Sequence, residues 1–377
     1  MARACVLADL DIVRPLGRRG VRCIAVARGT DPVRWSRFTA AFVDRTAWNT
    51  EEEQVEGLLA LAEREPESPT LFFANDQDLL MVSRHRAALG QAFRLAIADA
   101  DLVESLLEKT RAHERFEALG LPVPPLWQLD RHAGRPPDGI RYPVVVKPVV
   151  REHGPATGGA AKATRFGTAA ELETAWPALS ASPDDLLAQQ LIEGGEDRIE
   201  SYHVYVDAAG EIAGEFCGRK LRTFPVRYGN TTALVTTDAG DVRDLGRRVV
   251  QGLGLRGVAK VDFKRDPEGR LWLLEINPRF NLWHHAGACA GVNIPALVHA
   301  DLTGTPRPAV HSPRAGLTWT DPLMDRRARR EAGVSVPRWL AWTARADSRW
   351  SIALDDPLPV VRGIVAPFVR RRLPAGA

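Results

Sequence analysis

The sequence predicts a mixed α/β and α+β protein in three parts: a parallel α/β domain, a larger region of antiparallel hairpins, and a helical, aromatic-rich C-terminal appendage. Apolar segments at 4–7 and 21–26 flank a helix-compatible stretch, as in the opening of a parallel βαβ unit. Apolar segments at 258–264 and 271–277 are separated by a turn sequence, which favours an antiparallel hairpin. Beyond residue 304 the composition changes: prolines come first, and tryptophans interleaved with arginines follow.

The composition is that of an ordinary globular protein. Of the 377 residues, 45% are hydrophobic and 26% are charged, and the net charge of +3 is too small to predict a nucleic-acid partner. The four cysteines are scattered without metal-binding spacing, which indicates free thiols in a reducing compartment. The sequence shows neither a signal-peptide core after Met1 nor an apolar run of membrane-spanning length, so we expect a cytoplasmic protein.

Acidic and amide residues follow one strand of the predicted N-terminal domain. The apolar segment at 70–74 leads directly into Asn75, Asp76 and Asp78, at the strand end where open α/β sheets bind ligands. Asp76 and Asp78 are candidates for contacting a substrate amine, although capping of the next helix explains them equally well. The glycine fingerprint of a dinucleotide site is missing, because residues 8–11 read Ala-Asp-Leu-Asp, and an NAD site is therefore disfavoured.

A helix predicted at 102–119 separates this domain from the rest. Gly120 and the prolines that follow it are a strong helix stop and indicate a nearby domain boundary. Lys109 lies in this helix, where exposure to solvent is the simplest interpretation.

Two polar residues interrupt the apolar segment at 271–277. Glu275 and Asn277 are two positions apart and therefore share one face of a strand, and the predicted hairpin brings Asp262 beside them. Two carboxylates and an amide oxygen form a hard-oxygen site that suits Mg²⁺ or Mn²⁺ with water and substrate phosphate in its shell. Arg279 follows the same strand, where it could neutralise charge developing on an oxyanion. The alternative is a solvated surface hairpin, which the apolar neighbours disfavour.

Several cationic residues lie where they could meet phosphates. Lys147 ends a Val-rich strand and must either reach solvent or meet an anion. A small-residue loop at 153–163 contains Lys162 but lacks the ending of a P-loop. A basic segment at 218–229, predicted to be a loop, is solvated unless it faces the acidic site, where it would suit ATP phosphates and a carboxylate substrate. It contains Lys220, Arg222 and Arg227.

The segment at 186–197 suits a connection between two lobes. It is an apolar strand that turns through two glycines into acids. Backbone groups of Leu191 and Ile192 could bind an adenine edge there, and Glu196 could accept hydrogen bonds from ribose hydroxyls.

Taken together, these features resemble the ATP-grasp superfamily over roughly residues 1–305. The motif Leu-Glu-Ile-Asn-Pro-Arg at 274–279, with an upstream aspartate at hairpin distance, is the specific part, whereas the small-residue loop is not. The resemblance also rests on Lys109, the strand at 144–148 and the segment at 189–196. Within the superfamily, the D-aspartate ligase and carboxylate–amine ligase branch is the most similar, through segments 36–38, 75–78 and 219–229.

The resemblance implies a Rossmann-like pre-ATP-grasp domain at 1–105, an ATP-grasp domain at 106–305 and a C-terminal extension at 306–377. The small lobe would span about 125–190, and the large lobe, with the metal site, about 191–305. ATP would be bound by Lys109, Lys147, Lys162, Gln190, Leu191, Ile192, Glu196 and Lys220. Mg²⁺ or Mn²⁺ would be bound by Asp262, Glu275 and Asn277. The charge repulsion between carboxylate and γ-phosphate would be offset by Arg222, Arg227 and Arg279.

The activity implied is that of a ligase with small-molecule substrates. ATP would phosphorylate a carboxylate, and an amine, such as that of an amino acid, would attack the acyl phosphate to give an amide, ADP and phosphate. The alternatives are an ATP-dependent carboxylase, a kinase that stops at the acyl phosphate, or a nucleotide-binding regulatory module without turnover.

Two regions depart from the family pattern: the long loop after Lys147, which carries Arg151, Glu152 and His153, and the segment that follows Asn281. His284 and His285 follow the metal strand in place of small polar residues, and they either line an acceptor pocket or pack as structural residues. The C-terminal extension contains Trp319, Trp339, Trp342 and Trp350 among arginines. We expect it to be an amphipathic appendage packed on the core; an anionic membrane surface or an acidic partner is the alternative.

Overall fold

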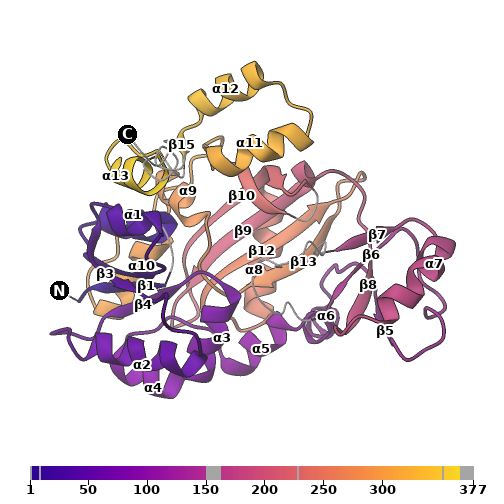
Figure 1. The fold of residues 1–377 in the computed structure, drawn as a ribbon, viewed down its shortest axis with the longest axis horizontal. Helices are drawn as coiled ribbons and strands as arrows, with labels where there is room; N and C mark the ends of the chain where they lie inside the picture. Colours follow the sequence, from indigo (N-terminus) through magenta and orange to yellow (C-terminus); the bar gives the residue numbers. More distant parts are fainter. Residues whose placement is uncertain (1, 8–9, 150–162, 227–228, 350–351, 366–377) are drawn as a thin grey trace, which may run out of the picture.

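The computed structural model describes residues 2–7, 10–149, 163–226, 229–349 and 352–365. Three sheets make up the fold, and they follow one another along the chain (Figure 1). Lys162, Arg227 and Trp350, together with the arginines at 370–372, lie outside the described residues.

The N-terminal domain is a parallel sheet covered by helices. Its strands lie in the order β3-β2-β1-β4, and β1 pairs in parallel with both β2 and β4, which confirms the predicted βαβ opening. The strands are β1 (Ala4–Leu7), β2 (Cys23–Ala27), β3 (Thr39–Asp44) and β4 (Thr70–Phe73). The helices are α1 (Leu10–Gly17), η1 (Pro32–Trp35), α2 (Glu51–Ala62), α3 (Asp76–Arg84) and α4 (Arg86–Ala92).

Two helices, and not the single one predicted at 102–119, leave this domain. They are α5 (Ala100–Leu107) and α6 (Lys109–Ala118). Glu108 stands between them with an extended backbone, and its carboxylate accepts hydrogen bonds from the N–H groups of Thr110 and Arg111. This acidic cap stabilises the start of a second helix, because it satisfies N–H groups that have no partner within the helix. Lys109 is consequently the first residue of α6.

The small lobe is an antiparallel sheet with its own core. The strand order is β5-β8-β6-β7, and the lobe extends to the right in Figure 1. Its apolar core includes Val144, Val146, Phe166 and Trp176. The elements are β5 (Leu126–Leu129), β6 (Val144–Pro148), β7 (Thr164–Phe166), α7 (Ala169–Ser180) and β8 (Leu186–Gln190).

The large lobe is built on a seven-stranded sheet in the order β13-β12-β9-β10-β11-β14-β15. The predicted hairpin is confirmed: β12 and β13 are antiparallel, and Asp262 stands directly opposite Glu275. The strands are β9 (Ile199–Val206), β10 (Ile212–Phe224), β11 (Asn230–Thr237), β12 (Gly257–Arg265), β13 (Leu271–Asn277), β14 (Thr318–Thr320) and β15 (Ser348–Arg349). The helical elements of this lobe are η2 (Glu196–Arg198), α8 (Gly240–Gly252), α9 (His284–Cys289) and α10 (Ile294–Thr303).

The prediction of a basic loop at 218–229 is wrong for most of its length. Strand β10 continues to Phe224 and pairs with β11 through Phe224 and Asn230. Basic side chains at 219, 220 and 222 are compatible with a strand because a cross-strand partner supplies the backbone hydrogen bonds, which the local sequence does not reveal.

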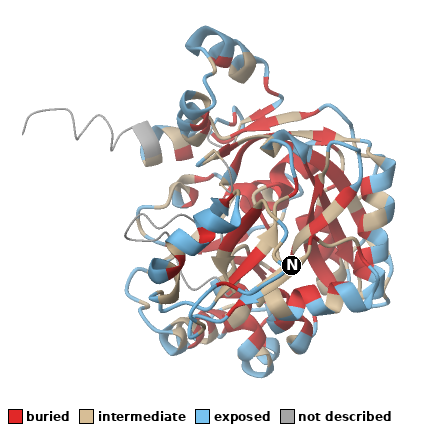
Figure 2. Cartoon of the chain, turned by 90° about the vertical axis from the view of Figure 1, so that its right-hand side faces the viewer, coloured by how far each residue is buried: buried red, intermediate tan, exposed pale blue. Residues whose placement is uncertain are grey.

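The N-terminal domain and the large lobe share their apolar cores. One cluster joins Leu7 and Phe73 of the parallel sheet to Val261 and Phe263 of β12. Figure 2 shows this burial along the strands, with the exposed residues on the outer helix faces. In the described part of the chain, no helix is long and apolar enough to cross a membrane.

The C-terminal extension packs back on the large lobe, as expected. Strands β14 and β15 extend the large sheet, while α11 (Pro322–Glu331), α12 (Val336–Arg345), α13 (Leu358–Val360) and η3 (Val361–Val365) follow outside it (Figure 1). Trp319 and Trp339 are buried, and the guanidinium of Arg222 lies 4.2 Å from the ring centre of Trp342. The tryptophans therefore serve packing in the described region.

A buried carboxylate, Asp325 of α11, holds this extension to β10. It accepts two hydrogen bonds from Arg222, at 2.8 and 2.7 Å, one from Thr232 at 2.8 Å and one from the indole of Trp339 at 2.9 Å. Asp325 has no exposed surface. The extension is thus tied to the sheet by a satisfied buried ion pair.

Replacing Asp325 with asparagine is expected to lower the free energy of unfolding by about 1.5–3 kcal/mol, because the charge-assisted bonds to Arg222 are lost. Urea-induced unfolding would measure this change. The matched control is Asp138→Asn, which removes an exposed pair with Arg135 and should leave the free energy of unfolding nearly unchanged. Equal losses in the two variants would contradict the role of Asp325.

Candidate nucleotide and metal site

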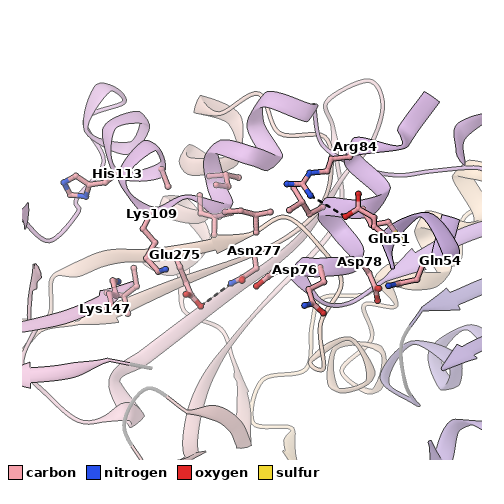
Figure 3. A pocket seen from close by; sticks show the side chains of 18 of the residues that line it. Glu51, Gln54, Asp76, Asp78, Arg84, Lys109, His113, Lys147, Glu275 and Asn277 are labelled. Carbon is pink, nitrogen blue, oxygen red and sulfur yellow. Dashed lines mark hydrogen bonds and ion pairs between the residues drawn. The ribbon is translucent and has the colours of Figure 1, made fainter. Parts of the chain in front are cut away.

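A cavity of about 680 Å³ lies where the N-terminal domain, α6, the small lobe and β13 meet. Figure 3 shows its polar side chains in one row, from Lys147 and His113 at the small-lobe end, through Glu275 and Asn277, to Glu51 and Gln54 at the N-terminal-domain end. The structure therefore brings Lys109 and Lys147, from early in the chain, together with Glu275 and Asn277 from its last third.

The three predicted metal ligands lie on neighbouring strands. Asp262 on β12 is directly opposite Glu275 on β13, and Asn277 is opposite Lys260 on the same face. The amide of Asn277 donates to Glu275 at 3.3 Å. Asp262 is buried and accepts hydrogen bonds from Ser201 at 2.5 Å and from Lys260 at 2.6 Å.

This donor set fits a hard divalent cation. Two carboxylates and one amide oxygen are too few to complete a coordination shell, which suits Mg²⁺, because this ion keeps waters and substrate phosphate oxygens as ligands. Among the described residues, no group of three or more histidine, cysteine, aspartate or glutamate side chains offers an alternative metal site. Asp262, Glu275 and Asn277 therefore stay the predicted ligands of the ion.

Lys260 is a site residue that the sequence analysis missed. Its amine lies 2.6 Å from Asp262 and 5.8 Å from the ring centre of Trp283. Burial lowers its pKa below the usual lysine value, and Lys220 lowers it further against the attraction of Asp262. The signal was the period of two in the strand, which places Lys260 on the same face as Asp262.

Lys220 also faces the acids. It lies 3.5 Å from Asp262. Burial alone would lower its pKa, but the charges of Asp262, Glu275 and Glu196 outweigh burial and raise it. Conversely, burial alone would raise the pKa of Asp262, but Lys220 and Lys260 hold it below its usual value. The site is thus a balanced cluster of charges.

The two predicted phosphate-binding lysines of the described chain lie at the end of β6. Lys109 donates to the carbonyls of Pro148 and Val149, at 2.6 and 3.0 Å. Lys147 donates to the side-chain oxygen of Gln189 on β8 at 2.8 Å. These bonds pre-orient both amines beside the cavity.

The connecting segment between the lobes starts at the end of β8. The N–H of Leu191 already donates to the carbonyl of Pro143 at 2.9 Å, so a contact with adenine would use its carbonyl. Gln190 is bonded through its N–H to Pro125, Ile192 is buried, and Glu196 opens η2. The structure keeps these residues at the base of the small lobe.

The predicted catalytic arginines have different surroundings. Arg279 donates to Asp76 at 2.5 Å, to the carbonyl of Ala74 at 3.0 Å and to Asn277 at 3.3 Å, and so joins the N-terminal domain to the metal strand. Arg222 is held by Asp325 in the C-terminal contact described above, which gives it a structural task.

His284 and His285 are both buried, and neither is among the residues that line the cavity. His285 accepts a hydrogen bond at Nε2 from Arg18 at 2.8 Å, since arginine can only donate. Burial, together with Arg18 and Arg14, lowers its pKa to about 3. Packing is therefore the role that the structure supports for His285.

This histidine should make stability pH-dependent. Its folded pKa is depressed, so its contribution is fully present above an unfolded pKa of about 6.5 and is lost as pH falls toward 3. Between pH 6.5 and 5, we expect wild type to lose about 1.4 kcal/mol per pH unit more than His285→Gln, measured by urea unfolding. The exposed control His132→Gln should keep the wild-type profile; parallel profiles for His285→Gln and wild type would contradict this.

Comparison with known proteins agrees with this geometry. A domain model described as ATP-grasp in the biosynthetic pathway with Ter operon matches residues 209–321. The D-alanine–D-alanine ligase of Stutzerimonas stutzeri (strain A1501) is 29% identical over 215 aligned residues, and the match covers 51% of this chain and 63% of that ligase. That of Methylococcus capsulatus (strain ATCC 33009 / NCIMB 11132 / Bath) is 28% identical over 212 residues, covering 51% and 64%. The chain thus matches less than two thirds of the length of these relatives.

Solved structures show the same fold. The L-amino acid ligase from Bacillus licheniformis superposes with a TM-score of 0.61 at 16% identity, over 80% of this chain and 74% of the ligase. A biotin carboxylase from Campylobacter jejuni in its β-γ-ATP complex gives a TM-score of 0.63 at 17% identity, over 84% and 74%. The chain is thus similar to an ATP-grasp domain over residues 209–321, to D-alanine–D-alanine ligases over about half of its length, and in fold to the L-amino acid ligase and the biotin carboxylase.

Proposed function

We propose that this protein is an ATP- and Mg²⁺-dependent ligase that joins a small carboxylate to an amine, such as that of an amino acid. The observation that carries the proposal is the common cavity of Lys109, Lys147, Glu275 and Asn277. The names of the aligned relatives, D-alanine–D-alanine ligases, support ligation as the reaction. All four cysteines are unpaired thiols, which supports action in a reducing compartment, the cytoplasm.

The reaction has two balanced steps. First, a carboxylate oxygen bonds to the γ-phosphorus of ATP while the bond from that phosphorus to the β–γ bridging oxygen breaks, so that ADP leaves. Then the amine nitrogen bonds to the acyl carbon, the bond from carbon to the phosphate oxygen breaks, and the amine loses a proton to solvent or phosphate. Phosphorylation thereby converts a carboxylate oxygen, which is a poor leaving group, into part of a phosphate, which is a good one.

The residues of this chain would position the substrates and neutralise the charge of the phosphates. A bound Mg²⁺ would offset the charge of the phosphates. Lys109 and Lys147 would hold the phosphate oxygens from the small-lobe side, while Lys220 and Lys260 balance the acids opposite. Arg279 holds the end of β13 against the end of β4, where ligands of open α/β sheets bind.

Turnover with a panel of acids and amines tests the proposal. ADP and phosphate should accumulate only when ATP, Mg²⁺, an acid and an amine are all present, and mass spectrometry should show an amide of the two. ADP formed without any amine would favour a kinase or a carboxylase. No turnover across the panel would favour a regulatory nucleotide-binding module.

A further inference from the structure

The N-terminal-domain end of the cavity is lined by charged side chains that are almost all paired. Arg45 forms an ion pair with Asp78 at 2.9 Å, and Arg84 forms one with Glu51 at 3.4 Å. Asp76 is paired with Arg279, as described above. These charges are satisfied within the protein and require no ionic partner from a ligand.

Arg28 is different from them. It lines the same cavity and is exposed, and within the described ranges no acidic side chain forms an ion pair with it. Arg45 and Arg84, which line the same cavity, each have a carboxylate, so Arg28 is the guanidinium of the described lining that has no acidic partner. A planar guanidinium with free donors is suited to bidentate binding of a carboxylate or a phosphate.

The backbone that carries Arg28 is well anchored. Arg28 directly follows β2, and its carbonyl accepts from the N–H of Asp31 at 2.8 Å in a turn. The N–H of Gly29 donates to Thr46 at 3.3 Å, and a side chain at Gly29 would collide with Asp44. The position of Arg28 at the carboxyl edge of the parallel sheet is therefore set by the fold, and this is the edge at which such sheets bind ligands.

The distance along that edge indicates the size of the ligand. Arg279 contacts the carbonyl of Ala74 just beyond β4, and Arg28 follows β2, two places away in the sheet order. Neighbouring strands are about 4.8 Å apart, so the two strand ends are separated by about 10 Å. The flexible side chain of Arg28 shortens this span, so a small acid with charges several bonds apart has the length to run along this edge to Arg28.

We propose that Arg28 binds a second anionic group of the acid substrate, which is therefore a dianion whose second charge is a carboxylate or a phosphate ester. The cavity that contains Glu275 and Asn277 continues to Arg28, which supports an acid substrate that extends from the metal end to Arg28. This inference rests on the proposed ligase function and adds the class of acid that the enzyme selects.

Matched pairs of acids test it, with one amine kept constant and ADP formation as the readout. The pairs are aspartate with asparagine, glutamate with glutamine, and phosphoserine with serine. The preferred dianion shows whether the group that Arg28 binds is a carboxylate or a phosphate ester. Wild type should show a higher kcat/KM for the dianionic member. Arg28→Ala should raise the KM of that member about 10- to 100-fold with little change in kcat, and Arg28→Lys should recover part of the loss.

The control is Arg64→Ala, which removes an exposed arginine of the same domain away from the cavity and should leave the preference unchanged. Turnover with equal use of both members, or an effect of Arg28→Ala on the KM of the amine alone, would overturn the inference while the ligase function stands. Absence of turnover with all pairs and amines would contradict the ligase function itself, and the inference with it.

Discussion

Replacing Glu275 with glutamine is expected to lower kcat for ADP formation about 100- to 1000-fold and to leave the melting temperature nearly unchanged. The substitution preserves size but removes one of the two carboxylates opposed on β12 and β13. The remaining carboxylate, Asp262, already contacts Ser201 and Lys260. The variant would therefore offer a divalent cation little charge to bind.

The dependence on metal should change as well. Loss of an outer-shell partner of a metal ligand already costs about 10- to 100-fold in metal affinity, so loss of a ligand itself should raise the Mg²⁺ concentration for half-maximal rate by at least about tenfold in Glu275→Gln. The matched control is Glu268→Gln, in the exposed turn of the same hairpin, which should behave as wild type. Near-normal kcat in Glu275→Gln would contradict the assignment of Glu275 to the metal.

Replacing Asp356 with alanine is expected to lower the free energy of unfolding by about 3–5 kcal/mol, because it leaves a buried charge without its partner. Asp356 accepts hydrogen bonds from Arg14 at 2.9 Å, from Ser36 at 2.8 Å and from the N–H of Arg37 at 2.9 Å. Arg14 and Asp356 are both fully buried. The last described segment thereby closes over the first domain.

The adjacent residue provides the control for this experiment. Asp355 pairs with Arg18, but both side chains are partly exposed, so Asp355→Ala should cost no more than about 1 kcal/mol in urea unfolding. Similar losses in both variants would show that burial does not set the strength of these contacts.

The sequence was most informative where the signals are local. The turn at 266–269 and the alternation on each side of it predicted the β12–β13 hairpin, and the same alternation placed Asp262 beside Glu275. The parallel opening of the N-terminal domain was recognisable from two apolar strands around a helix. These features depend on residues fewer than about 25 positions apart.

It was least informative where distant residues decide the outcome. Whether 218–224 forms a loop or a strand depends on pairing with β11, and the task of Arg222 depends on Asp325, which lies 103 positions later. Likewise, nothing near Lys260 in the sequence shows that Ser201 and Lys220 also contact the carboxylate of Asp262, with which Lys260 is paired. Local propensity carries no information about such partners.

The contact between Arg14 and Asp356 joins residues that are 342 positions apart. On the ribosome, the first domain emerges long before the residue that neutralises its interior guanidinium, and domains of nascent chains generally begin to fold as they appear. A nascent chain that ends before residue 356 would lack the ion pair between Arg14 and Asp356, so the first domain would gain this part of its stability only after Asp356 has been synthesised.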